Sequence, residues 1–234
     1  MDIFDKILSE WNIGLSDKQL KLFEMYDELL ISWNEKINLT SLTDKEDVFV
    51  KHFADSIAVL KYKDLSGKSL LDVGTGAGFP GVPLKIVCPD CKITLADSLN
   101  KRIKFLDVLI SELDLSGITA VHGRAEDLAS DECYRERFDV VTSRAVANLS
   151  TLSEYCLPFV NINGTFVSYK SGMVDDELSC ADKAIVTLGG KLSRVEKYSI
   201  PFTEYDRSLC FIDKISYTDR KYPRKAGIPL KKPL

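Results

Sequence analysis

The spacing of hydrophobic positions along the chain changes near residue 66. Before that point, apolar residues recur every three or four positions, the spacing of helices that bury one face: Leu20, Phe23, Tyr26, Leu30 and Trp33. Two segments of this region, 16–19 and 43–46, match the capping box that starts many helices. We therefore predict a helical N-terminal region in which the second capping box opens a helix over 47–60.

After residue 66, short apolar runs alternate with helical segments. The runs predict strands at 69–73, 92–96, 118–122, 138–142 and 164–169. Helices are predicted between them, at 82–87, 101–113 and 175–188. Two further strand-like runs, 194–200 and 207–215, have a short connection that favours an antiparallel hairpin. The pattern indicates an α/β fold, doubly wound, with a mostly parallel sheet and an N-terminal helical extension.

Composition is ordinary for a globular protein and excludes few functions. The 234 residues are 45% hydrophobic and 28% charged, which fits one α/β domain with an extension or at most two small domains. No apolar run approaches the roughly 20 residues of a membrane span. The first five residues lack the basic, then apolar pattern of a signal peptide, so we expect a cytoplasmic protein without membrane contact.

The six cysteines carry little functional signal. Cys88 and Cys91 form a C-x-x-C pair, but no second pair and no matching histidines accompany them. A structural zinc site needs four such ligands. We interpret these cysteines as reduced, incidental thiols and expect no metal.

The segment 69–81 carries the strongest sign of a ligand. Three alternating glycines follow its strand: Gly74, Gly76 and Gly78. Glycine lets a backbone turn sharply and approach a ligand closely. The helix that begins after them leaves unpaired N–H groups facing the same ligand. We predict a nucleotide-type cofactor loop.

Two cofactors fit this loop. Residues 76–81 satisfy the G-x-G-x-x-G pattern of dinucleotide-binding folds, which favours NAD. Asp72, however, ends the preceding strand, and a carboxylate there would repel a pyrophosphate. S-adenosylmethionine carries a sulfonium and an ammonium group and no phosphate, so Asp72 favours this methyl donor. Asp97, after the second strand, suits a ribose hydroxyl of either cofactor.

Further candidate contacts follow the third and fourth predicted strands. Residues 123–127 offer a backbone amide and a carboxylate for an adenine edge, although a helix N-cap by Glu126 or Asp127 also explains them. Arg144 could pair with the carboxylate of the cofactor through its fork of donors, or form a surface salt bridge. His52 lies alone in a predicted helix, and we interpret it as a hydrogen-bonded structural residue without a catalytic role.

The last stretch of the chain is basic. Residues 214–234 contain seven basic side chains and one acidic one, a net charge of +6, while the rest of the chain carries −10. This asymmetry favours a polyanionic partner. Tyr217 and Tyr222 are interleaved with the charges and could stack on unpaired bases. A solvated terminal tail is the alternative.

Several segments together resemble the small-subunit ribosomal RNA methyltransferase G family, also called glucose-inhibited division protein B. They are 33–40, 52–56, 71–81, 97–102, 143–145 and 224–229. The glycine loop alone indicates only a methyltransferase that uses S-adenosylmethionine. The Asn-Leu-Thr, Ser-Arg-Ala and Gly-x-Pro segments are more specific. The resemblance implies a seven-stranded Rossmann-like methyltransferase domain over 66–218, a helical cap over 1–65 and a basic tail over 219–234.

The resemblance also implies a reaction, the methylation of N7 of one guanine in 16S rRNA. It implies cofactor contacts at Gly74, Phe79, Ala125, Glu126 and Arg144, to which the residue pattern adds Asp72, Gly76 and Asp97. Guanine N7 carries a lone pair and needs no general base, so we name no catalytic acid or base. Alignment of the reacting atoms alone can contribute about 7–11 kcal/mol.

The expected partner is 16S rRNA, within the 30S subunit or its precursor. Five basic residues are predicted to contact phosphates: Lys170, Arg220, Lys221, Arg224 and Lys225. A small-molecule methyltransferase would share the loop but leave the basic tail unexplained. An NAD oxidoreductase would need an acid or base for hydride transfer near the strand ends, and the sequence offers no convincing one. A purely binding role is disfavoured by the complete cofactor loop.

Overall fold

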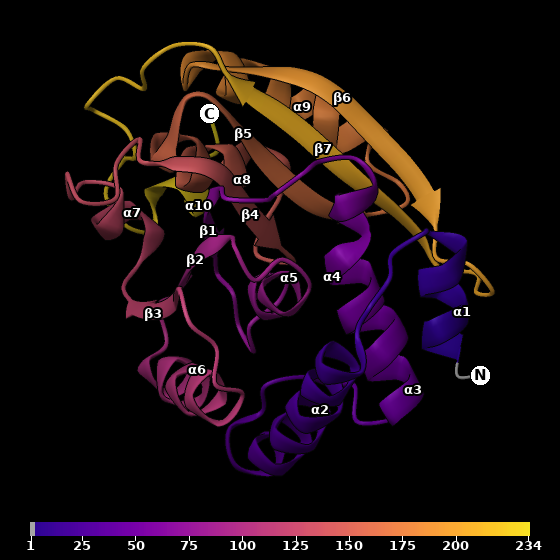
Figure 1. The fold of residues 1–234 in the computed structure, drawn as a ribbon. Helices are drawn as coiled ribbons and strands as arrows, with labels where there is room; N and C mark the ends of the chain where they lie inside the picture. Colours follow the sequence, from indigo (N-terminus) through magenta and orange to yellow (C-terminus); the bar gives the residue numbers. More distant parts are fainter. Residues whose placement is uncertain (1–2) are drawn as a thin grey trace.

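The computed structural model of the chain describes residues 3–234, so Met1 and Asp2 of the predicted N-terminal region lie outside the described part. A seven-stranded sheet forms its centre, in the spatial order β3-β2-β1-β4-β5-β7-β6 (Figure 1). The strands are β1 (Ser69–Val73), β2 (Lys92–Asp97), β3 (Ile118–His122), β4 (Phe138–Arg144), β5 (Val160–Ser171), β6 (Gly190–Ser199) and β7 (Asp206–Lys214).

The direction of the strands confirms the predicted sheet. Strands β1 to β5 are parallel, while β7 runs antiparallel to both β5 and β6. The predicted hairpin between the last two strands is therefore confirmed. Strand β4 is longer than predicted, because Ser143 and Arg144 pair with β5. This extension carries Arg144 to the carboxyl edge of the sheet as part of a strand.

Helices cover both faces of the sheet. After β1 they are α5 (Gly81–Val87), α6 (Asn100–Glu112), α7 (Ala125–Leu128), α8 (Leu149–Cys156), the short 3₁₀ turn η3 (Leu157–Phe159), α9 (Asp175–Thr187) and α10 (Ile228–Lys231). Before β1 they are α1 (Ile3–Glu10), α2 (Asp17–Ile37), α3 (Lys45–Val48), the π-helical turn η1 (Phe49–Ala54), α4 (Asp55–Ile57) and the 3₁₀ turn η2 (Ala58–Lys61).

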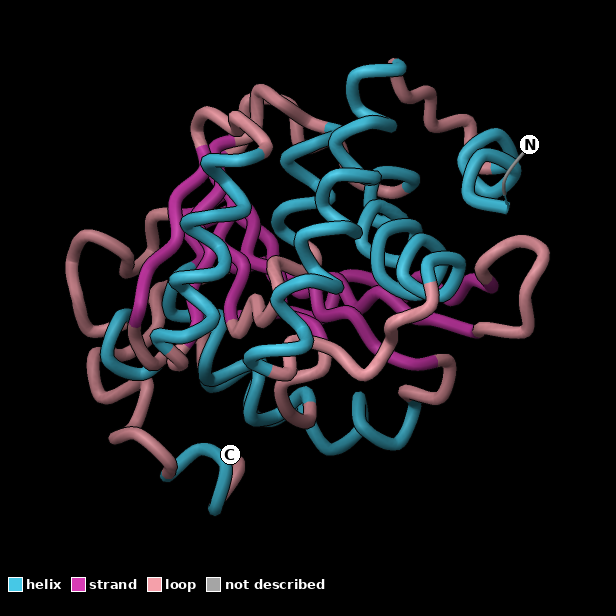
Figure 2. Tube along the Cα trace, turned by 90° about the horizontal axis from the view of Figure 1, so that it is seen from below, coloured by secondary structure: helices cyan, strands magenta, loops and turns pink. Residues whose placement is uncertain are grey.

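Alternating residues of the strands build two hydrophobic cores, one on each face of the sheet. Figures 1 and 2 show the helices that cover these faces. Successive strand residues point to opposite faces. Leu70 of β1 belongs to a cluster with side chains of α1, α2, α5 and α6. Its neighbour Leu71 belongs to a second cluster with side chains of α8 and α9. The predicted doubly wound arrangement is confirmed.

The N-terminal helices pack against the first of these cores. Ser16 caps α2 with the predicted capping box, in which it exchanges hydrogen bonds with Gln19. The second capping box is wrong by one residue. Asp44, not Thr43, is the cap and accepts a hydrogen bond from the backbone N–H of Asp47 at 3.2 Å. The continuous helix predicted over 47–60 is instead a series of short α, π and 3₁₀ turns.

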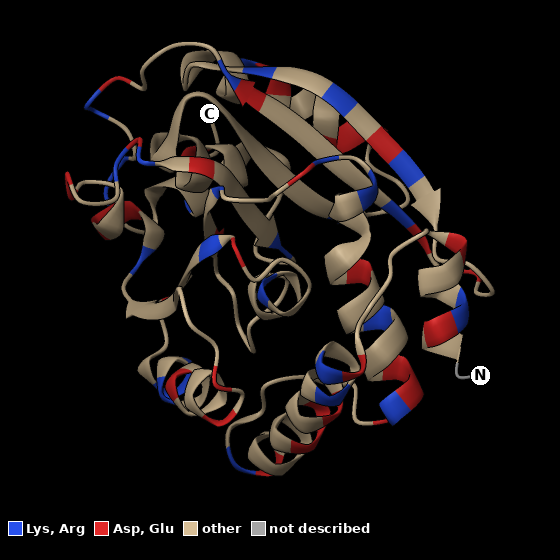
Figure 3. Ribbon diagram, viewed as in Figure 1, with Lys and Arg blue, Asp and Glu red and all other residues tan. Residues whose placement is uncertain are grey.

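Charged side chains lie mainly on the outside of this arrangement. Strand β6 forms one edge of the sheet, and bands of basic and acidic residues follow one another along it (Figure 3). Charges on an edge strand discourage pairing with another chain. Among residues 3–234, no helix is both long and apolar enough to cross a membrane.

Candidate functional site

The glycine loop between β1 and α5 is shaped by a carboxylate behind it. Gly74, Gly76 and Gly78 all have positive φ angles, of 70°, 63° and 101°. Asp72 is fully buried, and its carboxylate accepts hydrogen bonds from Thr75 Oγ1 at 2.7 Å and from the backbone N–H of Gly81 at 3.0 Å. The two ends of the loop are therefore fixed to one side chain.

This placement corrects the role predicted for Asp72. Its carboxylate also accepts a hydrogen bond from Thr142 Oγ1 at 3.1 Å, and no part of it lines a cavity beside the loop. Burial raises the pKa of Asp72 to about 6, against the lowering effect of its hydrogen-bond donors. The residue shapes the loop from behind and faces neither cavity.

The N-terminal helices hold the other side of the loop. The hydroxyl of Tyr26, in α2, donates a hydrogen bond to the backbone carbonyl of Ala77 at 2.5 Å. The ring of Phe79 stacks with Tyr26 at a centroid distance of 5.4 Å and with His52 at 4.4 Å. The predicted N-terminal cap is thus part of the wall of the site.

A chain of hydrogen bonds connects the Asn-Leu-Thr segment to Arg144 at the end of β4. Asn34 Oδ1 accepts from the backbone N–H groups of Leu39 at 2.6 Å and Thr40 at 2.8 Å. Thr40 Oγ1 lies 2.8 Å from His52 Nε2, and His52 Nδ1 lies 3.2 Å from a terminal nitrogen of Arg144. Arginine can only donate, so Nδ1 accepts and Nε2 carries the proton and donates to Thr40.

His52 is uncharged in this network. Burial, followed by the nearby charge of Arg144, lowers its pKa from 6.5 to about 3. The predicted hydrogen bonding of His52 is confirmed. Its place against Phe79 and Arg144 was not predicted, because a lone histidine on a helix gives no sign of what packs against it.

Arg144 is held by the N-terminal region. One terminal nitrogen donates to Asp55 Oδ2 at 2.9 Å, and the guanidinium lies 5.0 Å from the centre of the Phe79 ring. Asp55 also accepts from Tyr198 at 3.0 Å. The side chains of Arg144 and Asp55 are only 13% and 7% exposed, so this is a buried ion pair and not the surface salt bridge considered above.

Two adjoining cavities follow the carboxyl ends of β1 to β4. The first, of about 390 Å³, contains Gly76, Phe79 and Arg144 in its walls. The second, of about 350 Å³, contains Ala125 and Glu126. Gly74 and Asp97 line both cavities. The structure therefore brings together every predicted cofactor residue except Asp72.

Asp97 connects the second strand to the glycine loop. Its Oδ2 atom accepts from the backbone N–H of Gly76 at 2.9 Å and from Arg102 at 3.1 Å, while Oδ1 accepts from the N–H of Leu99. Arg102 also lines the first cavity and was missed by the sequence analysis, although it lies in the segment 97–102 that carries the family resemblance. Helix α7 has no side-chain cap, so Glu126 is not used as one.

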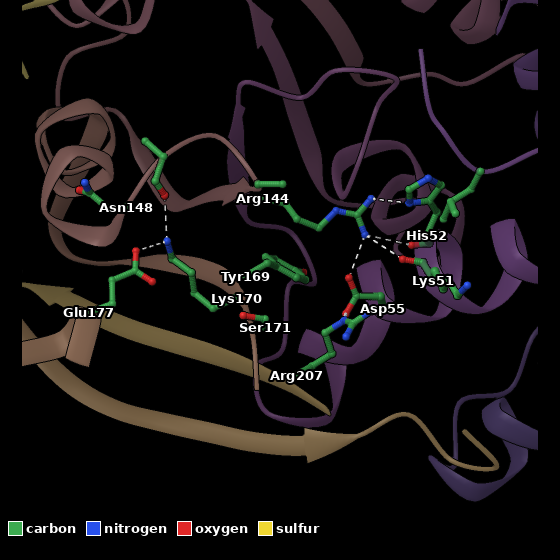
Figure 4. A pocket seen from close by; sticks show the side chains of 13 residues that line it. Lys51, His52, Asp55, Arg144, Asn148, Tyr169, Lys170, Ser171, Glu177 and Arg207 are labelled. Atoms are coloured by element: carbon green, nitrogen blue, oxygen red, sulfur yellow. Dashed lines mark hydrogen bonds and ion pairs between the residues drawn. The ribbon is translucent and has the colours of Figure 1, made fainter. Parts of the chain in front are cut away.

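A third, larger cleft of about 740 Å³ shares His52, Arg144 and Ala145 with the first cavity. Figure 4 shows Lys51, Arg144, Lys170 and Arg207 around it, with Asp55 and Glu177 as the acidic side chains. Lys170 donates to Glu177 at 2.5 Å and to the carbonyl of Ala147 at 2.9 Å. The four cations outnumber the two acids that line the cleft, and each cation has an acidic partner, which for Lys51 is Asp47 at 2.7 Å.

The basic residues of the tail have different surroundings. Arg220 and Lys221 are exposed and form ion pairs with the exposed acids Glu132 and Asp219. Lys225 is also exposed. The structure corrects the phosphate contact predicted for Arg224. Its guanidinium pairs with Glu154, whose side chain is 1% exposed, so its charge is already used inside the protein.

The C-x-x-C pair has no features of a reactive or metal-binding site. Burial raises the pKa of Cys88 and of Cys91 to about 11, so both remain protonated thiols near neutral pH. Metal ligation requires the thiolate. Within residues 3–234, no group of three or more histidine, cysteine or acidic side chains is arranged to hold a metal ion.

Comparison with protein families and curated proteins gives one consistent result. The model of the GidB family, described as rRNA small subunit methyltransferase G, matches residues 19–210. The chain is 51% identical over 235 residues to "Ribosomal RNA small subunit methyltransferase G" of Lactococcus lactis subsp. lactis (strain IL1403), covering 100% of this chain and 98% of that protein. The protein of the same name from Geobacillus sp. (strain WCH70) is 48% identical, covering 99% and 98%.

Solved structures of low sequence identity share the fold. TYW2 of M. jannaschii, solved in complex with AdoMet, is 13% identical with a TM-score of 0.56, covering 70% of this chain and 76% of that chain. TrmN of Thermus thermophilus is 16% identical with a TM-score of 0.53, covering 71% and 53%. At these identities the likeness concerns the fold alone.

Proposed function

The chain belongs to the rRNA small subunit methyltransferase G family, and from this premise we propose that it transfers a methyl group from S-adenosylmethionine to N7 of a guanine in 16S rRNA. The observation that carries the proposal is the pair of adjoining cavities at the carboxyl ends of β1 to β4, the place where α/β sheets bind ligands. Both are walled by the glycine loop and by Asp97.

The walls of these cavities fit the methyl donor. A Cβ atom at Gly76 would meet no protein atom within 4 Å, so space for a ligand remains beside the loop backbone. We assign the methionine part of the cofactor to the cavity of Phe79 and Arg144, and the adenosine part to the cavity of Ala125 and Glu126. Asp97 stands between them, at the position of the ribose.

The chemistry requires little from the protein beyond alignment. When bound, S-adenosylmethionine supplies an electrophilic methyl group on a sulfonium. Guanine N7 attacks with its own lone pair, so no side chain has to remove a proton. His52 is uncharged and hydrogen-bonded on both nitrogens, which suits a positioning role beside Phe79 and Arg144. The walls orient the donor, and orientation can supply about 7–11 kcal/mol.

The third cleft supports an RNA acceptor. It adjoins the methionine cavity through His52 and Arg144, and its excess of cations suits a phosphodiester backbone. We assign the target nucleotide to this cleft, with Lys170 near its phosphates. Arg220, Lys221 and Lys225 are exposed and are assigned to neighbouring phosphates of 16S rRNA, within the 30S subunit or its precursor in the cytoplasm. Arg224 is left out of this set.

Two alternatives share parts of the site. NAD would place a pyrophosphate at the loop, but the chain belongs to a family of methyltransferases, which disfavours NAD. A small-molecule methyltransferase would use the two cofactor cavities but would not need a cleft lined by four basic side chains beside them.

The experiment is methyl transfer with labelled S-adenosylmethionine to 16S rRNA and to 30S subunits that lack the modification, followed by mapping of N7-methylguanosine. We expect one labelled guanine. Calorimetry with S-adenosylmethionine and with NAD is the companion measurement. Binding of NAD alone, or label in small molecules only, would contradict the proposal.

A further inference from the structure

The segment that follows β7 returns to the carboxyl edge of the sheet and closes one side of the second cavity. Gly227 and Leu230 line this cavity together with Ala125, Glu126 and Tyr155. In Figure 1 the yellow segment with α10 lies beside α7 and α8. The basic tail is therefore also a wall beside the residues assigned to adenosine.

The wall is fixed to α8 by a buried ion pair. Arg224 Nε donates to both carboxylate oxygens of Glu154, at 2.9 and 3.1 Å, and its backbone N–H donates to Oε1 at 2.7 Å. A terminal nitrogen of Arg224 donates to Oε2 at 2.5 Å. Glu154 itself is inaccessible to solvent. Thr151 Oγ1 adds a hydrogen bond to the carbonyl of Pro229 at 3.2 Å. A wall held at several points has a defined position relative to the cavity.

The same segment orients Glu126. Its Oε1 atom accepts a hydrogen bond from the backbone N–H of Gly227 at 3.0 Å. Glu126 is 9% exposed and borders the cavity, so one oxygen is fixed by the tail while the carboxylate faces the ligand space. Leu230 is 61% exposed although it is a large apolar residue on a cavity wall. An adenosine in the cavity would cover part of this surface.

We propose that Arg224, Gly227 and Leu230 are part of the cofactor site. Leu230 makes an apolar contact with the adenosine, Gly227 orients the carboxylate of Glu126, and Arg224 is a positioning residue that fixes both through Glu154. The inference rests on the proposed function for the identity of the ligand. Arg224 is thereby assigned to cofactor binding, whereas the positive charge of its side chain, considered alone, suggests RNA binding.

Two variants of α10 test the contact. Leu230 lines the cavity, whereas Ile228, two residues earlier and 39% exposed, does not. We expect Leu230→Ala to weaken the binding of S-adenosylhomocysteine and of 5'-methylthioadenosine by the same factor, about threefold to tenfold, since both probes carry the adenosine. Ile228→Ala should leave both dissociation constants within about twofold of the wild type. Calorimetry measures the dissociation constants. Because the side chain of Leu230 is largely exposed, we expect the Leu230→Ala variant to remain folded, so weaker binding would reflect the lost contact.

Two variants of the anchor test the positioning role. Arg224→Lys keeps the charge but loses the paired donors, and it should raise the KM for S-adenosylmethionine while leaving the KM for RNA near its wild-type value. Lys225→Ala, at the exposed neighbour, should raise the KM for RNA alone. An Arg224→Lys variant that raises only the KM for RNA would overturn the assignment.

The outcomes separate this inference from the function on which it rests. Wild-type protein that binds neither adenosine probe would refute both. Wild-type binding with equal affinities for Leu230→Ala and Ile228→Ala would refute the wall contact and leave the methyltransferase proposal intact.

Discussion

His52 Nδ1 accepts a hydrogen bond from Arg144 at 3.2 Å, and this contact joins the N-terminal helices to the carboxyl edge of the sheet. His52 also forms a hydrogen bond with Thr40, and Arg144 also donates a hydrogen bond to Asp55. Three segments that lie far apart in the sequence, around residues 40, 52–56 and 144, thus form one network beside the glycine loop. The helical N-terminal region thus forms part of the wall of the candidate site.

The neutral state of His52 predicts a pH dependence of stability. Its pKa is about 3 in the folded protein and 6.5 in the unfolded chain, so folding releases a proton. The stability that it contributes is fully present above pH 6.5 and is lost as the pH falls towards 3. Between pH 7 and pH 5, the wild type should lose about 2 kcal/mol more unfolding free energy than His52→Gln.

Urea unfolding at the two pH values measures this difference. His122→Gln, which replaces the other histidine of the chain, is the matched control and should behave like the wild type. Equal losses in the wild type and His52→Gln would show that His52 does not titrate as described.

Asp72→Asn should damage both the fold and the cofactor loop. The asparagine amide keeps one acceptor oxygen, but its NH₂ group cannot accept hydrogen bonds from the groups that donate to the carboxylate of Asp72 in the wild type. We expect a loss of about 1–3 kcal/mol in unfolding free energy and a cofactor affinity weakened by about tenfold or more.

Asp139→Asn is the control for this variant. Asp139 accepts from Ser69 and Asn161 at the amino end of the strands, away from the loop. It should lower stability without changing the affinity for S-adenosylmethionine. If the two variants affect that affinity equally, Asp72 has no specific effect on the loop.

Tyr26→Phe removes the hydrogen bond to the carbonyl of Ala77 while keeping the ring that stacks on Phe79. We expect a loss of about 1 kcal/mol in unfolding free energy and weaker binding of S-adenosylmethionine. Tyr169→Phe removes a comparable buried bond, to the carbonyl of Ser56, outside both cofactor cavities. Only the Tyr26 variant should weaken cofactor binding in calorimetry. Unchanged cofactor binding in both variants would show that the hydroxyl of Tyr26 does not support the site.

Replacing Arg220, Lys221 and Lys225 together by alanine should weaken RNA binding and flatten its dependence on salt. Each lost phosphate contact lowers the slope of log K against log salt by about 0.7 to 0.9, so a reduction of about 2 to 3 is expected. Cofactor affinity should not change. Lys104→Ala, at an exposed position of α6, is the control. An unchanged slope in the triple variant would place the RNA contacts elsewhere.

The parallel strands of the sheet were predictable because each contains a short apolar run, bounded by glycines or polar turns. β1 and β3 have the predicted bounds. The exact ends of β4 and β5 were not predictable, because they depend on pairing between the two strands, which no local pattern records. Arg144 was placed after its strand for this reason, while the structure includes it in β4.

The residues proposed for the cofactor could be brought together from the sequence in part because they follow strand ends, where parallel sheets gather their ligands. Asp72 was given the wrong role, since a carboxylate beside glycines can face a ligand or hold the loop from behind. Arg224 was misassigned because sequence shows a charge but not its partner. Glu154 lies 70 positions earlier, on a helix that the sequence analysis did not predict.

The participation of residues 227 and 230 in the second cavity has a consequence for biosynthesis. The other walls of that cavity come from residues 73–155, which leave the ribosome much earlier. A nascent chain can therefore form the sheet and the glycine loop before this binding pocket is complete. Binding of the adenosine should therefore require synthesis to continue past residue 230, and a translation product stalled before that residue should lack this binding.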